Sequence, residues 1–447
     1  MKKRIVYLLV LLTAVLSMAK EHRLTAGAAK VDISPPIGIW LCGWLARDRP
    51  SEDIADNLYA KAVVIDDGRT KIAVVTTDLL KTYPDVNKIM KEEIYHRTGL
   101  DADHVLITAS HTHFSPCIGL DSDKPYVNDY TRTVIAKIAG LVERADRNRR
   151  PAWIGCADGK AAGLTFNRRV IGSDGAIQMH WRMPGDTTGM TFGPIDPEVG
   201  VIRFDNHKGE RIASLVNYST HPVCGMNEMY SISADYPAYT MQLIERIEGG
   251  VSLFSLGASG NQVPVEREGN SRVEIGRALG AEALKILQRM PVYNGFPIGV
   301  KAREIVCPTQ REIAPTDSIR VKVQIFAIGD IILVALPGEV FVELGLKLKE
   351  KIQHPLYICQ LSNGGNVGYI LNERDYAEGG YEAISALLAP GMGEYLIDEA
   401  AKMIGQLSWC TEAIKVVRTD SITSPFEDYS QKGYDIRKEE WGDRKGL

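Results

Sequence analysis

The sequence predicts an α/β fold in which mixed β-sheets are flanked by helices. Short apolar runs alternate with amphipathic segments along most of the 447 residues, which is typical of sheets with helices packed on their faces. Two pairs of apolar runs are joined by Asp67-Gly68 and Gly329-Asp330, turns that favour hairpins. No linker rich in Pro and Ser divides the chain, so we expect one domain over residues 20–447.

In the first half of the chain, residues 26–38 contain Pro35 and Pro36, so this segment is expected to be irregular. The strands and helices expected after it are, in order, strands at 58–65 and 71–77, a helix at 84–97, a strand at 105–109 and a helix at 130–149. The strand, helix and strand from 71 to 109 predict a βαβ unit. Such a unit would bring Asp78 to the edge where the strand at 105–109 ends. There Asp78 could orient a functional side chain or simply form a solvated cap.

In the second half, the loop-rich segment 159–197, which contains Trp181, is either a binding loop or a structural insert. The elements expected after it are strands at 200–204 and 211–217, a helix at 238–248, a strand at 251–256, a helix at 271–288, strands at 321–327 and 331–336, a helix through Leu348, a strand at 356–361, helices within 384–406 and a strand at 412–417. The residues from Thr423 onward are polar, and we expect a surface tail.

The first 19 residues have the pattern of a secretory signal peptide. Lys2-Lys3-Arg4 precedes an apolar run that ends in Ser17-Met18-Ala19, a plausible cleavage site. The alternative is an uncleaved membrane anchor. We expect a secreted or periplasmic protein with no transmembrane segment after signal removal.

Charge and cysteine content narrow the function classes further. The net charge of −4 gives no electrostatic case for binding nucleic acid. The seven cysteines are scattered without a C-x-x-C pair, so neither a zinc ribbon nor a dense disulfide framework is indicated. Export would permit a disulfide, but spacing alone supports no particular pairing.

Three polar segments follow predicted strands and carry candidate metal ligands. Ser110-His111-Thr112-His113 comes after the strand at 105–109, and on an extended backbone its two imidazoles would share a face. His221 and Glu339 each follow a later apolar run. Imidazole and carboxylate are common ligands of catalytic zinc, although they also suit manganese or iron. The alternative is a set of unrelated polar side chains that never meet.

A turn of small residues, Gly257 to Pro264, follows the strand at 251–256. Such a turn lets a backbone approach a ligand closely and can present amide groups to an anion. It is also compatible with an ordinary turn between a strand and a helix.

Several short motifs together resemble one known family. They are Ala26 to Ile33, Ser110 to His113, Asn167-Arg168, His221-Pro222, Ser233 to Asp235, Pro337 to Glu339, and Tyr369 with Tyr381 to Ser385. The chain resembles the neutral/alkaline non-lysosomal ceramidases, specifically their N-terminal catalytic domain, over nearly all of its length after the leader.

The resemblance implies an amide-cleaving zinc enzyme and assigns roles to individual residues. One zinc ion would be held by four ligands, which are His111, His221, Glu339 and Tyr369. His113 would orient substrate or carry a proton beside the metal. Arg168 would lie near the site, and Tyr381 would stabilise the oxyanion of the tetrahedral intermediate.

The sequence departs from this family at two points. In ceramidases the glycine-rich turn ends in Gly-Asp-Val-Ser-Pro, whose serine attacks the amide; here Val263 stands at the serine's position. Ser259 lies four residues earlier as an unproven substitute. We also expect no C-terminal immunoglobulin-like domain.

We therefore predict a secreted zinc-dependent hydrolase that cleaves an amide or ester in a small-molecule, lipid or glycan substrate. Attack would come directly from zinc-activated water, without an acyl-enzyme. One alternative is a metal-dependent lyase or hydrolase acting on acidic or acylated sugars. Another is a non-catalytic relative that only binds its ligand.

Overall fold

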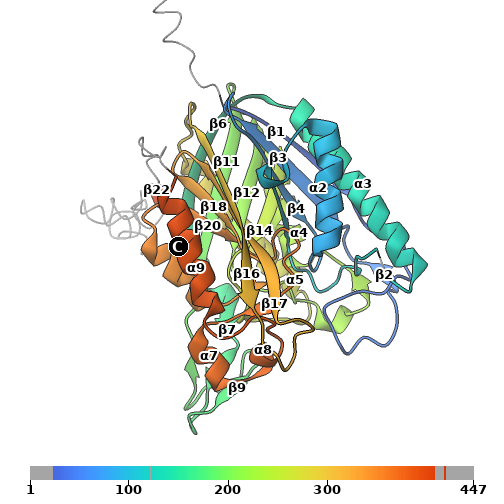
Figure 1. Cartoon of the computed structure of the whole chain (residues 1–447), viewed down its shortest axis with the longest axis vertical. Helices are drawn as coiled ribbons and strands as arrows, with labels where there is room; N and C mark the ends of the chain where they lie inside the picture. The colour runs from blue at the N-terminus through green and yellow to red at the C-terminus, as the bar shows by residue number, and fades with distance from the viewer. Residues whose placement is uncertain (1–23, 121, 408–416, 419–447) are drawn as a thin grey trace, which may run out of the picture.

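The computed structural model describes residues 24–120, 122–407 and 417–418. Within these residues the predicted α/β fold is confirmed. A large mixed sheet and a four-stranded sheet pack face to face, and helices cover both outer surfaces (Figure 1). The predicted signal peptide and the polar tail lie outside the described residues.

The large sheet has the strand order β14-β12-β11-β6-β1-β3-β4-β5. Its strands are β1 (Thr25–Asp32), β3 (Tyr59–Asp66), β4 (Lys71–Thr77), β5 (Val105–Ala109), β6 (Arg150–Lys160), β11 (Glu198–Asn206), β12 (Arg211–Tyr218) and β14 (Val251–Leu256). The sheet curls, so that β14 at one end contacts β3, β4 and β5 at the other. This curl brings strands from the two halves of the chain together.

Strand β1 corrects the expectation of an irregular segment for residues 26–32, whereas residues 33–38 are irregular as expected. The run Ala26-Gly27-Ala28-Ala29 lacks large apolar side chains and therefore gives no clear strand signal. A Cβ atom at Gly27 would lie 2.3 Å from the carbonyl oxygen of Ala145, in helix α3 (Pro125–Arg147). The small residues are needed because this helix crosses the strand closely.

The predicted hairpin and βαβ unit at the start of the chain are both confirmed. Strands β3 and β4 pair antiparallel around Asp67-Gly68. Strand β4, helix α2 (Pro84–Thr98) and the parallel strand β5 form the βαβ unit. Helix α3 begins earlier than the predicted residue 130, because Pro125 supplies a favourable first-turn residue.

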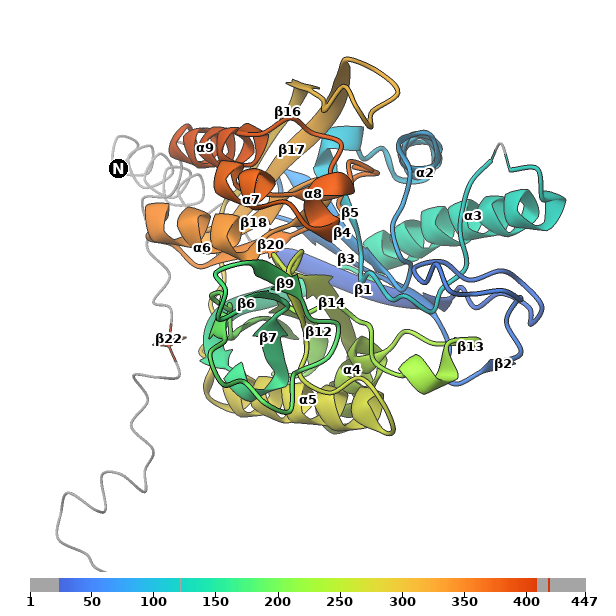
Figure 2. The same ribbon diagram turned by 90° about the horizontal axis from the view of Figure 1, so that it is seen from below.

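The second sheet has the order β16-β17-β18-β20, with β16 (Ile298–Pro308), β17 (Ser318–Ile328), β18 (Ile331–Ala335) and β20 (Leu356–Cys359). Apolar side chains of both sheets fill the space between them. Helices α2 and α3 cover one region of the large sheet, and α4 (Tyr236–Glu248) and α5 (Ser271–Arg289) cover another. Helices α6 (Val342–Lys351) and α9 (Met392–Gly405) cover the second sheet, as Figure 2 shows.

Short elements build the end of the molecule that carries the polar motifs. They are β2 (Asp53–Ile54), β7 (Thr165–Asn167), β8 (Arg169–Ile171), β9 (Ile177–Met179), β10 (Thr191–Phe192), β13 (Ser231–Ile232), β15 (Gln262–Pro264), β19 (Glu339–Val340), β21 (Tyr369–Ile370), α7 (Glu373–Glu378) and α8 (Tyr381–Ile384). The helical region predicted at 384–406 is interrupted by Pro390-Gly391. Of the strand predicted at 412–417, only the end is described, in β22 (Val417–Arg418).

The six cysteines within the described residues fall into two groups. Cys42 and Cys117 form a disulfide with a Cα–Cα distance of 5.3 Å, a pairing that sequence spacing did not indicate. Cys156, Cys224, Cys307 and Cys359 are free and buried, as small apolar side chains are. Among the helices described, none is both long and apolar enough to span a membrane.

Candidate metal centre

The candidate ligands meet although their strands lie at opposite ends of the large sheet. His111 follows β5, and His221 follows β12. Because the sheet curls, the centroids of these two imidazole rings lie 4.9 Å apart. The His113 ring lies 4.9 Å from that of His111 and 5.9 Å from that of His221. The three imidazoles therefore form one cluster.

His111 and His113 meet by a different backbone geometry from the one expected. The chain is not extended at this point, because His111 has a left-handed φ of 68°. This conformation is strained for a residue with a Cβ atom, and such strain is concentrated at functional sites. The turn directs the imidazoles of His111 and His113 toward one centre, with 3.4 Å between their Nε2 atoms.

Each imidazole is held by a backbone carbonyl at its Nδ1 atom. His111 contacts the oxygen of Leu80 at 2.8 Å, His113 that of Gly43 at 3.0 Å and His221 that of Ser259 at 2.6 Å. A carbonyl can only accept, so in each ring Nδ1 carries the proton and donates it. In a neutral imidazole with this tautomer, Nε2 keeps its lone pair, as a metal ligand requires.

The carboxylate of Glu339 lies against these lone pairs. Its Oε2 atom is 3.1 Å from Nε2 of His221 and 3.3 Å from Nε2 of His111. Burial lowers the pKa of His221 to about 4. An anionic acceptor thus faces two neutral acceptors, an arrangement that a divalent cation would stabilise.

The ligating atoms of His111, His113 and His221 all lie within 4.8 Å of one another, a spacing that could hold a metal ion. Imidazole nitrogens and the Glu339 carboxylate are donor types that fit zinc. The residues present therefore fit the cation that the sequence predicted.

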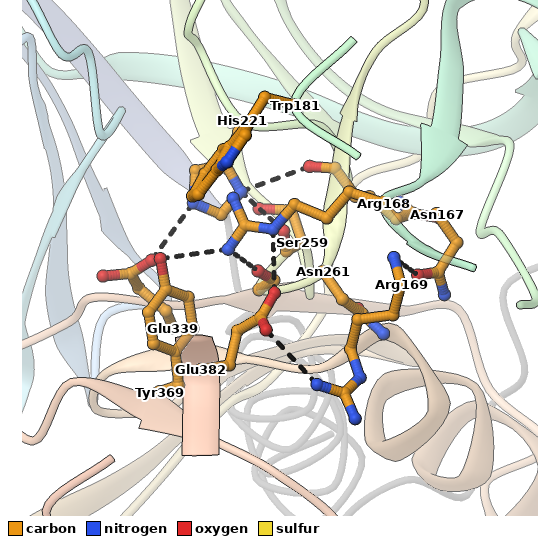
Figure 3. Close-up of polar contacts among 12 residues, drawn as sticks. Asn167, Arg168, Arg169, Trp181, His221, Ser259, Asn261, Glu339, Tyr369 and Glu382 are labelled. Atoms are coloured by element: carbon orange, nitrogen blue, oxygen red, sulfur yellow. Dashed lines mark hydrogen bonds and ion pairs between the residues drawn. The ribbon is translucent and has the colours of Figure 1, made fainter. Parts of the chain in front are cut away.

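Tyr369 is hydrogen-bonded to a buried arginine beside this cluster, as Figure 3 shows. Arg168 donates from Nη2 to the Tyr369 hydroxyl at 3.0 Å and from Nε to Glu382 at 2.9 Å. Burial opposes the charge of Arg168, but Tyr369 and Glu382 raise its pKa above the usual value. Glu382 also contacts Arg169 at 3.3 Å. This network fixes Arg168 beside the candidate metal centre.

Aromatic side chains surround Arg168 and His113. The Arg168 guanidinium lies 5.2 Å from the ring centroid of Trp181 and 6.0 Å from that of Tyr381. Trp181 is 44% exposed and Tyr381 36% exposed, so both are accessible to a substrate. Trp44 contacts the edge of His113, with 5.6 Å between ring centroids. Trp181 belongs to the loop-rich segment 159–197, which therefore contributes to the site.

Hydrogen bonds decide the roles of Asp78 and of the turn after β14, which the sequence left open. Asp78 accepts the backbone N–H of Tyr59 at 2.8 Å, whereas His111 is held by Leu80, so Asp78 does not orient His111. It is also desolvated, unlike the solvated cap that was the other expectation. The turn after β14 does not present an anion cradle. The N–H groups of Gly257, Gly260 and Gln262 donate to backbone carbonyls at 3.0, 2.7 and 2.9 Å, so they are not free to bind an anion.

The two residues near the expected nucleophile position have structural contacts. Val263 is fully buried and packs with Phe166 and Val223. Ser259 is also fully buried, and its hydroxyl accepts a hydrogen bond from Gln360 at 2.8 Å. Its carbonyl holds His221. The Ser259 hydroxyl is therefore sequestered rather than directed to the metal centre.

Sequence reasoning missed Glu382, Trp44 and Arg267, which also contribute to the site. Glu382 stands beside the predicted Tyr381, but a single acidic residue in a polar segment carries no signal. Arg267 follows β15 and is 2% exposed. The run Glu266-Arg267-Glu268 has the pattern of a solvated surface turn, which conceals its burial.

Fold and site together define an α/β protein with a candidate divalent-metal centre near strand ends. The family model for neutral/alkaline non-lysosomal ceramidase, N-terminal, matches residues 24–259, more than half of the chain. The chain belongs to this family.

Individual relatives agree with this assignment. The neutral ceramidase of Pseudomonas aeruginosa is 25% identical over 254 residues, which are 53% of this chain and 36% of that protein. The crystal structure of P. aeruginosa neutral ceramidase matches with a TM-score of 0.72 at 17% identity, over 89% of this chain and 76% of that one. A ceramidase complexed with C2 gives a TM-score of 0.71 at 18% identity, over 88% and 77% of the two chains.

Proposed function

We propose that this protein is an exported zinc-dependent hydrolase that cleaves an amide or ester bond without a serine nucleophile. Family membership supports hydrolysis. The observation that carries the metal dependence is the position of Glu339 Oε2, 3.1 and 3.3 Å from two imidazole nitrogens whose protons are committed elsewhere. This arrangement is electrostatically unfavourable unless a cation lies between the groups.

His111, His221, Glu339 and Tyr369 are proposed as the zinc ligands. Tyr369 is included because it is the register partner of Glu339 in the parallel pair β19 and β21, which places the two side chains next to each other. When bound, zinc polarises a substrate carbonyl and acidifies a water molecule. Manganese or iron would suit the same donors and are distinguished by metal analysis.

The remaining residues are assigned to the protein's part in the reaction. His113, with its Nδ1 proton committed to Gly43, presents Nε2 as the acceptor of a proton from the attacking water. It then returns this proton to the leaving group. Arg168 and Tyr381 stabilise the negative charge that develops on the carbonyl oxygen, where one donor is worth about 3 kcal/mol.

Val263 has no nucleophile, and the hydroxyl of Ser259 is engaged by Gln360, so water attacks the carbonyl carbon directly. The kinetic consequence is turnover without a burst of the first product.

Export is supported by the leader pattern of residues 1–19 and by the disulfide between Cys42 and Cys117, because disulfides persist in oxidising compartments. Residues 20–447 are proposed to act as one catalytic domain.

The test begins with metal analysis of the purified full-length protein. Zinc-loaded protein is then assayed against N-acyl lipids, acylated amino sugars and oligouronides, with rapid quenching to detect a burst. We expect one zinc per chain and chelator-sensitive release of an amine or alcohol without a burst. A covalent acyl adduct, or turnover that survives complete metal removal, would contradict the mechanism. Unsaturated product from oligouronides would instead identify a lyase.

A further inference from the structure

Arg267 is a buried cation without an acidic partner. Its Nε atom donates to the carbonyl of Val223 at 3.2 Å, and its Nη1 atom donates to the carbonyl of Trp181. In the described parts of the chain, no carboxylate lies within ion-pair distance of Arg267, and Nη2 has no hydrogen-bond partner. Taking an unpaired guanidinium out of water is costly, so this position calls for an anion.

Three other buried arginines near the site have carboxylate partners, whereas Arg47 donates from Nε, Nη1 and Nη2 to the backbone carbonyls of Met229, Cys42 and His113. Arg168 and Arg169 share Glu382, and Arg272 pairs with Glu228 at 2.8 Å. The carboxylate of Asp235 belongs to the same region, but its oxygens accept the backbone amides of Tyr236 and Cys224. Arg267 differs from these arginines because, among the described residues, it has neither a carboxylate partner nor an acceptor for Nη2.

A second unsatisfied donor adjoins Arg267. The Arg267 guanidinium lies 5.2 Å from the ring centroid of Trp44. The indole Nε1 of Trp44 is buried and has no hydrogen-bond partner among the residues that the structure describes. Unsatisfied buried donors are uncommon in folded proteins and call for an explanation. Two independent donors in one place thus lack an acceptor.

These donors lie directly beside the proposed catalytic groups. Trp44 contacts His113, with 5.6 Å between ring centroids. The carbonyl of Trp181 binds Arg267, while the ring of Trp181 lies 5.2 Å from Arg168. Arg267 is therefore separated from His113 and from Arg168 by a single aromatic residue in each case.

We propose that Arg267 and Trp44 form a subsite for a carboxylate of the substrate, next to the bond that is cleaved. This inference rests on the proposed hydrolase function and specifies its substrate class as carboxylate-bearing amides or esters, such as N-acyl amino acids. Nη2 of Arg267 and Nε1 of Trp44 would offer one N–H donor to each oxygen of a carboxylate. A phosphate would leave more acceptor positions without donors.

The experiment compares two compounds that differ only in this charge. N-octanoylglycine and N-octanoylglycinamide contain the same acyl–glycine bond, and zinc-loaded full-length protein is assayed with both. We expect wild-type kcat/KM to favour the acid by at least about tenfold. Arg267→Met is expected to lower kcat/KM for the acid by about 10- to 100-fold, mainly through KM, and to lower kcat/KM for the glycinamide by a clearly smaller factor.

Two further variants protect the test against a folding defect. Trp44→Phe keeps the aromatic ring and removes only the N–H, and it is expected to weaken the acid preference by about threefold or more. Arg267→Lys keeps the charge without the planar fork and should retain part of the preference. The subsite would be overturned if these variants lowered kcat/KM equally for both compounds, or did not lower kcat/KM for the acid.

Calorimetric binding of N-octanoylglycine separates this inference from the proposed function, because it requires no turnover. Binding to wild type that Arg267→Met weakens by about tenfold, without cleavage of either compound, would support the subsite and contradict the hydrolase. Cleavage of both compounds with equal efficiency, and equal binding by wild type and Arg267→Met, would support the hydrolase and overturn the subsite.

Discussion

Glu339 and Tyr369 are direct register partners in the two-stranded parallel pair of β19 and β21. Strand partners in register place their side chains on the same face, and Figure 3 shows both side chains directed toward His221 and Arg168. The pair joins the Glu339 carboxylate, which faces the imidazoles, to the Tyr369 hydroxyl that Arg168 contacts. The arrangement predicts which substitutions remove the metal and which remove only catalysis.

Replacement of His221 by Ala or of Glu339 by Gln is expected to abolish both metal content and activity, since each removes a proposed ligand. His113→Ala should keep the metal but lower kcat by about 100-fold or more, as expected for loss of a proton carrier. His207, which is exposed, provides the control variant His207→Ala. Metal content measured by mass spectrometry checks the assignment. Loss of zinc in His113→Ala would identify His113 as a ligand.

Replacement of Glu382 by Gln is expected to lower the free energy of unfolding by about 3–5 kcal/mol, because it leaves a buried guanidinium without its charge partner. Glu382 is fully buried and contacts both Arg168 and Arg169. Chemical denaturation of the metal-free protein measures this effect apart from metal binding. Glu378→Gln is a matched control, because Glu378 is more exposed and contacts Arg169 at 3.3 Å. Equal losses of unfolding free energy in the two variants would contradict the role of Glu382 as the buried charge partner of Arg168 and Arg169.

Gly43 is expected to tolerate no side chain. It has a φ of 97°, and a Cβ atom there would lie 2.6 Å from Cγ of His113. Gly43→Ala should therefore displace His113 and lower kcat. Gly38→Ala is the matched control, because Gly38 has a φ of 90° and no atom within 4 Å of a Cβ. Both variants carry similar backbone strain, so a kcat loss confined to Gly43→Ala would demonstrate the steric effect. Equal kcat values would refute it.

Asp78 is expected to make the folded protein less stable as the pH rises. Burial raises its pKa from 3.8 to about 7, against the opposing charge of Lys61. The folded state therefore binds a proton more tightly than the unfolded state, so its contribution is complete below about pH 4 and is lost as the pH approaches 7. Asp78→Asn keeps an acceptor for Tyr59 and should flatten the stability profile between pH 4 and 7. An unchanged profile would exclude Asp78 as its source.

The disulfide between Cys42 and Cys117 joins the segment of Gly43 and Trp44 to the segment that follows His113. Replacing both cysteines by Ser is expected to lower the free energy of unfolding by about 2–4 kcal/mol. A reducing agent should lower the Tm of wild type and leave the double variant unchanged. A similar response of both proteins to reduction would show that the bond does not stabilise the fold.

Local chemistry determined much of this protein from the sequence alone. The hairpin at Asp67-Gly68, the βαβ unit from β4 to β5 and the helix start at Ser271 each depend on neighbouring residues, so periodicity and turn residues predicted them. Motif resemblance likewise selected His111, His221 and Glu339, which the structure brings together. Strand β1 was missed because its residues are small in order to fit against α3, which lies far along the chain.

Only the tertiary structure decided how these parts combine. The curl of the large sheet joins β5 to β14, and this long-range packing, which no local pattern encodes, brings His111 to His221. Contacts with distant segments gave Glu382 two arginine partners. They left Arg267 without a carboxylate partner among the described residues. The sequence thus determined which side chains stand at the ends of strands. The fold determined which of them share a centre, because proximity and desolvation arise from contacts between residues far apart in the chain.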